Sequence, residues 1–234
     1  MHVFYAPGIN GNIYTLDEKE SGHCVRVLRM KKGTLTRLID GRGNLYEGII
    51  DNPDPRACTI SLTKTITGFE KRTYYLHIAI SPIKNPDRFE WFIEKCVEIG
   101  IDEITPLICK NTEKHNIKHE RINNLIISAM KQSLKSVATR LNEKAEFMDF
   151  IKRDFNGVKL ITHCSPEFER DQIGRLYKPG SPVVILIGPE GDFDGEEIAG
   201  AVKNGFQSAH LGTSRLRTET AGVVACHSVY FMNQ

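Results

Sequence analysis

The sequence lacks long apolar runs, a signal-peptide pattern and paired cysteines. No apolar stretch in its 234 residues approaches the roughly 20 residues that cross a bilayer, and no basic segment followed by an apolar core opens the chain. The six cysteines form no Cys-x-x-Cys pair, which argues against a structural zinc site or a thioredoxin-like motif. We therefore expect a soluble cytoplasmic protein with reduced cysteines and no bound metal.

An excess of one charge is also missing. The 31 Lys and Arg residues oppose 29 Asp and Glu residues, and the formal net charge is +2. Such a balance neither requires nor excludes a nucleic-acid partner, so local clusters must decide. His115 and His119 have a spacing that could suit a metal, but no third ligand lies near them in the sequence.

The first 70 residues alternate short apolar segments with turn residues. The pattern predicts strands over residues 35–39, 45–50 and 58–63, and a strand or a helix end over 25–29. Short strands with frequent turns favour a small β-barrel. The pattern changes around Gly68–Arg72, which divides the chain into predicted domains of residues 1–70 and 71–234.

From residue 74 onward, strand-like and helix-like segments alternate. The helix after the first strand has Asn85 as a possible cap, Pro86 in its first turn and Gly100 at its end. The alternation predicts an α/β fold, an open parallel sheet with helices on both faces. The strands are expected over residues 75–80, 104–108, 158–162, 182–187 and 208–211, and the later helices over 122–133, 196–204 and 218–232.

Three segments at predicted carboxyl ends of strands are candidate ligand loops, because open α/β sheets bind ligands there. They span residues 162–165, 187–191 and 211–221. The glycines of the second loop allow a ligand to approach the backbone, although an ordinary Gly-Pro turn would have the same sequence. This loop matches neither the GxxxxGK[ST] nor the GxGxxG phosphate-binding pattern.

The third loop carries charged residues at the start of an apolar helix. Thr218 could cap that helix, and Glu219 suits its positive end. Arg217 is slightly unfavourable at a helix N-terminus. A function that needs a fixed cation would explain its presence.

Five motifs follow one another along nearly the whole chain. They comprise His23, Val27, Leu28, Arg29 and Gly33; Lys84, Arg88, Trp91, Lys95, Glu98, Ile99 and Gly100; Gln132 and Ser133; Ile187–Phe193; and Leu211, Gly212, Leu216, Arg217, Glu219, Thr220 and Ala221. In this order the motifs resemble the RsmE family of 16S ribosomal RNA uridine-N3 methyltransferases in the SPOUT superfamily. The resemblance implies an N-terminal PUA-like RNA-binding barrel, a SPOUT domain with a deep trefoil knot, S-adenosyl-L-methionine as cofactor, the small ribosomal subunit as partner and a homodimer.

The chain departs from the family pattern at Ser214–Arg215, at Lys135 and near Thr139, where a proline is often found. Ser214 stands where an arginine is common in the third loop, and Arg215 follows it. Lys135 stands where the family usually has an arginine, so the charge is kept but the bidentate fork is lost.

The resemblance implies that the three loops hold the cofactor. For catalysis, N3 of uracil must lose its proton, and a fixed cation would stabilise the charge that spreads onto O2 and O4. Arg217 is the predicted cation, and Glu219 would accept the proton or orient Arg217. The predicted cofactor-binding residues are Thr162, His163, Ile187, Gly188, Pro189, Glu190, Gly191, Leu211, Gly212, Leu216, Thr220 and Ala221.

A local excess of basic residues indicates RNA contacts. Residues 110–140 contain seven Lys or Arg residues against Glu113 and Glu120, a balance that predicts a basic face suited to phosphates. A solvated charged surface is the alternative for any one of them. The predicted RNA-binding residues are His23, Arg26, Arg29, Lys84, Arg88, Lys110, Lys131, Lys135 and Arg215.

Two other functions remain open from the sequence. One is a SPOUT methyltransferase that acts on a ribose 2′-hydroxyl of another RNA. The other is a non-catalytic RNA-binding assembly factor, which would bind RNA without cofactor affinity.

Overall fold

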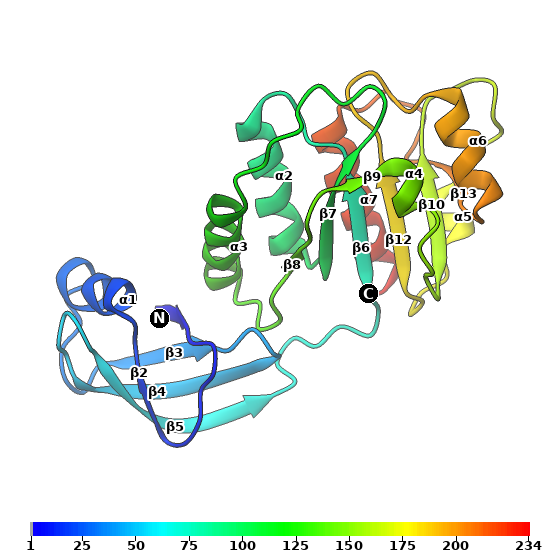
Figure 1. The fold of residues 1–234 in the computed structure, drawn as a ribbon. Helices are drawn as coiled ribbons and strands as arrows, with labels where there is room; N and C mark the ends of the chain where they lie inside the picture. The colour runs from blue at the N-terminus through cyan, green and yellow to red at the C-terminus, as the bar shows by residue number, and fades with distance from the viewer. Residues whose placement is uncertain (1) are drawn as a thin grey trace. The chain divides into compact units, whose positions relative to one another are not determined.

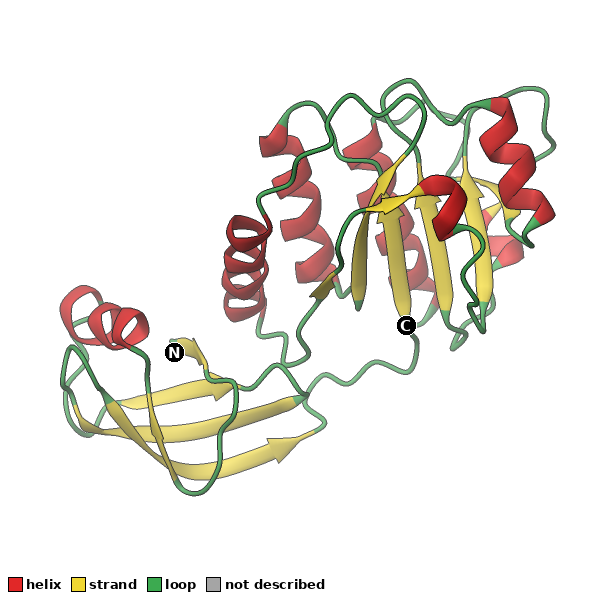
Figure 2. Ribbon diagram, viewed as in Figure 1, coloured by secondary structure: helices red, strands yellow, loops and turns green. Residues whose placement is uncertain are grey.

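The computed structural model describes residues 2–234, and the chain divides into two compact units (Figures 1 and 2). The first unit contains the chain up to Lys71 together with residues 127–138. The second contains residues 72–126 and 139–234. Among residues 2–234, no helix combines the length and the apolar character needed to cross a lipid bilayer.

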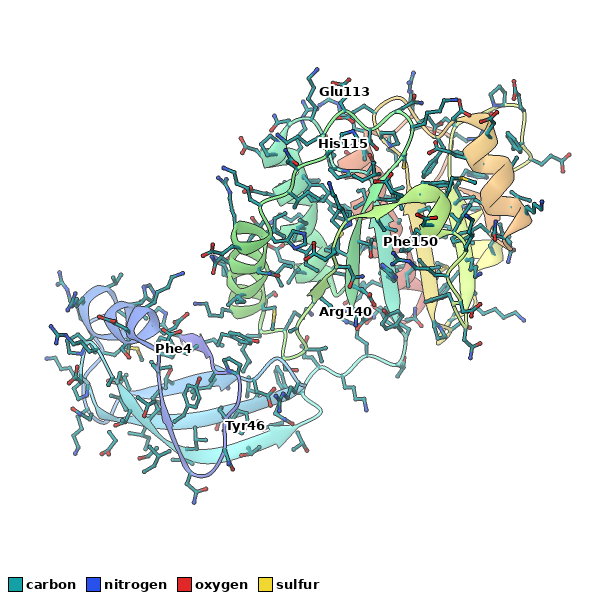
Figure 3. The ribbon with its side chains drawn as sticks, in the orientation of Figure 1. Phe4, Tyr46, Glu113, His115, Arg140 and Phe150 are labelled. Carbon is teal, nitrogen blue, oxygen red and sulfur yellow. The ribbon has the colours of Figure 1, made fainter. Side chains whose placement is uncertain are left out.

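The first unit is built on a curled five-stranded sheet in the order β1-β3-β4-β5-β2. The central strands β3, β4 and β5 pair antiparallel, whereas β1 runs parallel to β3. Phe4, Leu38, Ile50 and Ile60 are fully or almost fully buried in its core, and Figure 3 labels Phe4 there. The strands are β1 (Val3–Tyr5), β2 (Ile13–Thr15), β3 (Leu35–Ile39), β4 (Asn44–Asn52) and β5 (Thr59–Thr67).

Two short helices follow β2 in the same unit. Helix α1 (Glu18–Gly22) begins after Asp17, whose side chain accepts a hydrogen bond from the Glu20 backbone amide. It continues into a π-helical turn, η1 (His23–Val27). Of the two alternatives for residues 25–29, the helix end is therefore the one observed.

A later segment of the chain returns to this unit. Helix α3 (His119–Ser133) starts in the second unit and ends in the first. The Gly43 amide donates to the Ser136 carbonyl and the Ala138 amide to the Gly41 carbonyl, each over 2.9 Å. Because these bonds join main-chain groups, no side-chain pattern in the sequence signals the return.

The second unit contains a parallel sheet in the order β11-β13-β10-β12-β6-β7-β8. All residues of β6, β7 and β12 are buried, as expected for strands with both faces covered. The strands are β6 (Leu76–Ile80), β7 (Glu103–Ile108), β8 (Arg140–Leu141), β9 (Ala145–Glu146, paired with β7), β10 (Val158–Thr162), β11 (Asp171–Gln172), β12 (Val183–Ile187) and β13 (Gln207–His210).

Helices cover both faces of this sheet. Helices α2 (Pro86–Ile99) and α7 (Thr218–Met232) pack against each other on one face, where a side chain on Gly222 would collide with the Phe92 ring. The other face carries α4 (Phe147–Phe150) and α6 (Gly195–Lys203), and Figure 1 shows α4 and α7 on opposite sides of the strands. Helix α5 (Ile173–Leu176) contacts α7.

The α/β prediction is confirmed in its main elements. Asn85 caps α2 by accepting from the Asp87 amide over 2.9 Å, and the final helix spans the predicted residues. The prediction that Thr218 caps this helix is wrong, because Arg217 occupies the N-cap position and Thr218 is the first helical residue. The trefoil knot stays a prediction from the resemblance.

Candidate functional site

A cavity of about 470 Å³ opens at the carboxyl ends of β10, β12 and β13. Its wall consists of the loop that follows each of these strands, the first turn of α7, and Arg88 from α2. The volume lies within the range of about 300–1,000 Å³ for small-molecule sites. Since parallel strands deliver these three loops to one edge, the fold itself brings the candidate segments together.

The loop after β12 is fixed from both sides. Asp192 has a φ of 63°, and its amide donates to the Pro189 carbonyl over 3.0 Å, which closes a tight turn. Glu190 accepts a hydrogen bond from the Lys84 amide over 3.0 Å, and the Asn111 side chain donates to the Asp192 carbonyl over 3.1 Å. The loop backbone is therefore held rigidly at the cavity.

The loop after β10 presents a buried histidine. His163 is only 4% exposed, and both of its ring nitrogens are buried without a hydrogen-bond partner among residues 2–234. Burial lowers the pKa of His163, which favours the neutral ring. Asp192 accepts from the Cys164 amide over 2.7 Å, and Arg170 donates to the His163 carbonyl over 2.6 Å. His163 is thus a buried group with hydrogen-bonding capacity left for a ligand.

The first turn of α7 places charged groups at the cavity. Arg217 is exposed at the N-cap, and its side chain makes no capping hydrogen bond. The Glu219 carboxylate is almost buried, and its Oε1 lies 3.8 Å from Nε of Arg88. The sequence predicts that Glu219 accepts a proton or orients Arg217. In the structure, Glu219 forms an ion pair with Arg88.

Most of the predicted cofactor-binding residues line this one cavity. Gly191 and Thr220 do not, and Gly191 instead lies beside Asn111. The predicted residues in the wall are Thr162, His163, Ile187, Gly188, Pro189, Glu190, Leu211, Gly212, Leu216 and Ala221, together with Arg217 and Glu219.

Several residues of the cavity wall were not among the predicted cofactor-binding residues. Arg88 and Arg215, expected to contact RNA, line the cavity as well. Arg170 gave no sequence signal, because it stands outside all recognised motifs. Cys164 lies within a predicted loop and could have been found there. The other unpredicted wall residues are Asp192, Ala209, His210, Ser214 and Thr218.

The basic residues predicted to bind RNA are mostly engaged in ion pairs. Lys84 pairs with Glu113 at 2.8 Å and Lys110 with Asp194 at 3.0 Å in the second unit. In the first unit, Lys131 pairs with Glu20 and Lys135 with Glu70. Residues 110–140 also divide between the two units, so they do not form one basic face within either. The acidic partners are distant in sequence, which is why local charge counting missed them.

Some predicted RNA contacts remain accessible. His23, Arg26 and Arg29 are exposed in or just after η1, where Arg29 adopts a φ of 53°. Arg215 is exposed at the cavity.

The two histidines with helical spacing make separate contacts. Nε2 of His115 lies 2.9 Å from the Thr112 carbonyl, whereas His119 lies 3.5 Å from Glu143. Within residues 2–234 there is no group of three His, Cys, Asp or Glu side chains placed to hold a metal ion.

Comparison with known families assigns both parts of the chain. The family described as RNA methyltransferase domain matches residues 70–230, and the RNA methyltransferase PUA domain matches residues 16–63. The chain therefore belongs to the RNA methyltransferase family with an N-terminal PUA domain.

Named relatives narrow the family further. The chain is similar to ribosomal RNA small subunit methyltransferase E of Mesomycoplasma hyopneumoniae, with 32% identity over 72% of this chain and 75% of that protein. It also resembles the crystal structure of a probable rRNA methyltransferase from Porphyromonas gingivalis, with 38% identity, a TM-score of 0.92 and coverage of 100% and 98% of the two chains.

A third relative was solved with a ligand. It is a putative methyltransferase from Legionella pneumophila in complex with the bound cofactor SAM, with 26% identity, a TM-score of 0.88 and coverage of 100% and 98%. The RsmE resemblance read from the sequence is confirmed by these matches.

Proposed function

We propose that this chain transfers the methyl group of S-adenosylmethionine to N3 of a uridine in the 16S RNA of the small ribosomal subunit. The observation that carries the proposal is the cavity at the carboxyl ends of β10, β12 and β13, where rigid glycine-containing loops meet several arginines. The names of the relatives support the same reaction class.

The cavity wall fits S-adenosylmethionine. Ile187, Leu211 and Leu216 supply apolar surface in the cavity wall, which suits the adenosine part. The unpartnered ring nitrogens of His163 offer hydrogen bonds to its polar groups. When bound, the cofactor supplies an electrophilic methyl group on a sulfonium ion.

Arg217 is the proposed cation for the reacting base. Its guanidinium is exposed at the cavity, and none of the ion pairs among residues 2–234 involves it. It is therefore available to stabilise the negative charge that develops on O2 and O4 of uracil as N3 attacks the methyl group. Its N-cap position offers no structural compensation for placing a cation there.

Glu219 has two roles in the proposal. As a buried carboxylate in the cavity wall, it is the acceptor for the N3 proton. Its ion pair with Arg88 holds a second guanidinium at the cavity, where it can contact an RNA phosphate. The ring of the base must be aligned with the methyl group, and the rigid loop at Pro189–Asp192 serves this alignment.

The remaining assignments follow the family resemblance. We propose that the first unit contacts RNA through His23, Arg26 and Arg29, that the protein acts in the cytoplasm, and that it forms a homodimer near α7. The exposed Phe231 on α7, 69% accessible, is consistent with such a contact. Light scattering is the direct test: a single-chain mass of 26.4 kDa in solution would contradict the dimer.

Mass spectrometry of nucleosides tests the proposed reaction. Small subunits lacking the modification are incubated with S-adenosylmethionine and the protein, and the digested RNA is analysed. We expect 3-methyluridine in a sample with active protein and none without it. A 2′-O-methylated nucleoside would show that the protein methylates a ribose hydroxyl and not N3 of uracil. The absence of any methylation despite RNA binding would favour a non-catalytic assembly factor.

A further inference from the structure

A second hollow lies in the same unit at the amino ends of the parallel strands. It has a volume of about 420 Å³ and is lined by residues at or near the starts of β6, β7, β8, β12 and β13, by residues 142–144 after β8, and by the segment around α4. It shares no wall residue with the carboxyl-end cavity. Figure 3 labels Arg140 and Phe150, which belong to its wall.

A buried carboxylate forms the polar floor of this hollow. Glu103 is 8% exposed and accepts hydrogen bonds from the Tyr75 hydroxyl, from the Asn142 amide and, over 2.6 Å, from the Arg140 guanidinium. Burial alone would raise the pKa of Glu103, but the hydrogen bonds from Tyr75 and Asn142 hold it below its usual value. The floor therefore carries a fixed negative charge near neutral pH.

A neutral histidine lies beside this carboxylate. His77 is 7% exposed, and its Nε2 lies 2.7 Å from Oγ1 of Thr105. Burial lowers the pKa of His77 to about 4 in spite of the neighbouring negative charge of Glu103. The ring lies edge-on to Phe150 with 5.6 Å between the centroids. His77 is thus an uncharged hydrogen-bonding group in an aromatic setting.

Aromatic side chains and two exposed cations complete the hollow. Tyr75 and Phe155 approach each other with their centroids 6.3 Å apart. At the rim, the Arg153 guanidinium lies 5.1 Å from the centre of the Phe150 ring, and Lys144 is exposed. The rim also carries Glu143, which pairs with His119, and the exposed Asp154.

A stable core does not require a charged network at this position. Buried ion pairs are often no more stabilising than apolar residues of similar volume, because both charges must be desolvated. A hollow that keeps a charged group, a neutral imidazole and aromatic walls has the features of a binding site. Aromatic side chains stack on nucleobases, polar groups read their edges, and arginine or lysine contacts the phosphate.

We propose that this hollow is a second binding site that accepts a nucleotide, separate from the cofactor cavity. The base stacks on the half-buried Phe155 ring, with its edge toward His77 and Glu103, and the phosphate lies at Arg153 and Lys144. The nucleotide is either free or an unstacked residue of an RNA strand, which present the same chemistry. The proposal does not depend on the methyl-transfer reaction.

Calorimetric titration of the full chain tests the site. The cofactor cavity is first saturated with S-adenosylhomocysteine, and the protein is then titrated with GMP, AMP, CMP and UMP and with a single-stranded RNA hexanucleotide. The variants are Arg153→Glu, which reverses the rim charge, and Phe155→Ala, which removes a stacking wall. Lys203→Glu is the matched control, because this exposed lysine of α6 lies outside the hollow.

We expect at least one nucleotide or the hexanucleotide to bind, with an affinity about tenfold lower in Arg153→Glu and Phe155→Ala and unchanged in Lys203→Glu. Binding of mononucleotides identifies a free nucleotide, and binding of the hexanucleotide alone identifies an RNA residue. The proposal is overturned if none of these ligands binds, or if all three variants bind like the original protein. Circular dichroism of each variant confirms folding. Failure of S-adenosylhomocysteine to bind would count against the proposed function and not against this site.

Discussion

The two ends of the parallel sheet are built in different ways. At the carboxyl ends, loops with glycine and arginine form the wall of the larger cavity, and His163 has unpartnered nitrogens. At the amino ends, side chains of the strands and of the segments at residues 142–144 and around α4 form the hollow, and Glu103 and His77 are hydrogen-bonded to neighbours.

This difference separates two kinds of polar burial. At the amino end, the hydrogen-bonded Glu103 and His77 support the local structure, so removing either group should change the measured free energy of unfolding. At the carboxyl end, the buried and unpartnered His163 costs stability, and both His163 and the exposed arginines are available to ligands. Substitutions at the two ends should therefore affect different measurements.

The largest effect is expected at the carboxyl end. Arg217→Ala should lower the rate of methyl transfer by about 10²–10³-fold, because one fixed donor to a developing oxyanion is removed. Binding of S-adenosylhomocysteine and thermal stability should change little, since the side chain is exposed. Arg175→Ala, an exposed arginine of α5 outside the cavity, is the control for single-turnover kinetics. Near-normal turnover of Arg217→Ala would remove Arg217 from the mechanism.

A smaller effect is expected from pH at the amino end. Because the pKa of His77 is lowered to about 4, the unfolded chain binds its proton more readily than the folded chain does. The free energy of unfolding should therefore be fully retained above pH 6.5 and fall by about 3 kcal/mol as the pH drops from 6.5 to 4. Denaturant titration at several pH values measures this loss. In His77→Gln, the free energy of unfolding should lose the part of its pH dependence that comes from His77. An identical slope in the variant would mean that His77 is not buried neutral.

The smallest effect is expected from Glu103→Gln. The amide keeps the shape of the side chain but loses the charged hydrogen bonds with Tyr75, Asn142 and Arg140. We expect the free energy of unfolding to drop by about 1–3 kcal/mol, with cofactor binding unchanged. Loss of cofactor affinity in a folded Glu103→Gln protein would contradict the separation of the two ends.

The sequence predicted the parts of the fold that depend on local periodicity. The apolar runs that became β6, β10 and β12 and the capped helix after Asn85 were visible, because burial on both faces and capping leave direct patterns. The two- and three-residue strands were missed, because they are too short for a pattern. They pair through the backbone alone.

The candidate site was predictable in its loops but not in its charges. The predicted strand ends include residues 162–163, 187–190, 211–212 and 214–217, which line one cavity in the structure. The ion pair of Arg88 with Glu219, at 3.8 Å, joins α2 to α7. Lys110 likewise pairs with Asp194, which is far from it in the sequence. Such long-range partners depend on tertiary packing, so no local count of charges reveals them.

Hydrogen–deuterium exchange with and without S-adenosylhomocysteine tests most directly whether the cofactor binds at the carboxyl ends of the strands and not at the amino ends. We predict slower exchange in the loops at 162–164, 187–192 and 211–221, and unchanged exchange around residues 75–77, 103 and 140–144. Protection at the amino end, or no protection of the three loops despite measured binding, would contradict the assignment of the carboxyl-end cavity as the cofactor site.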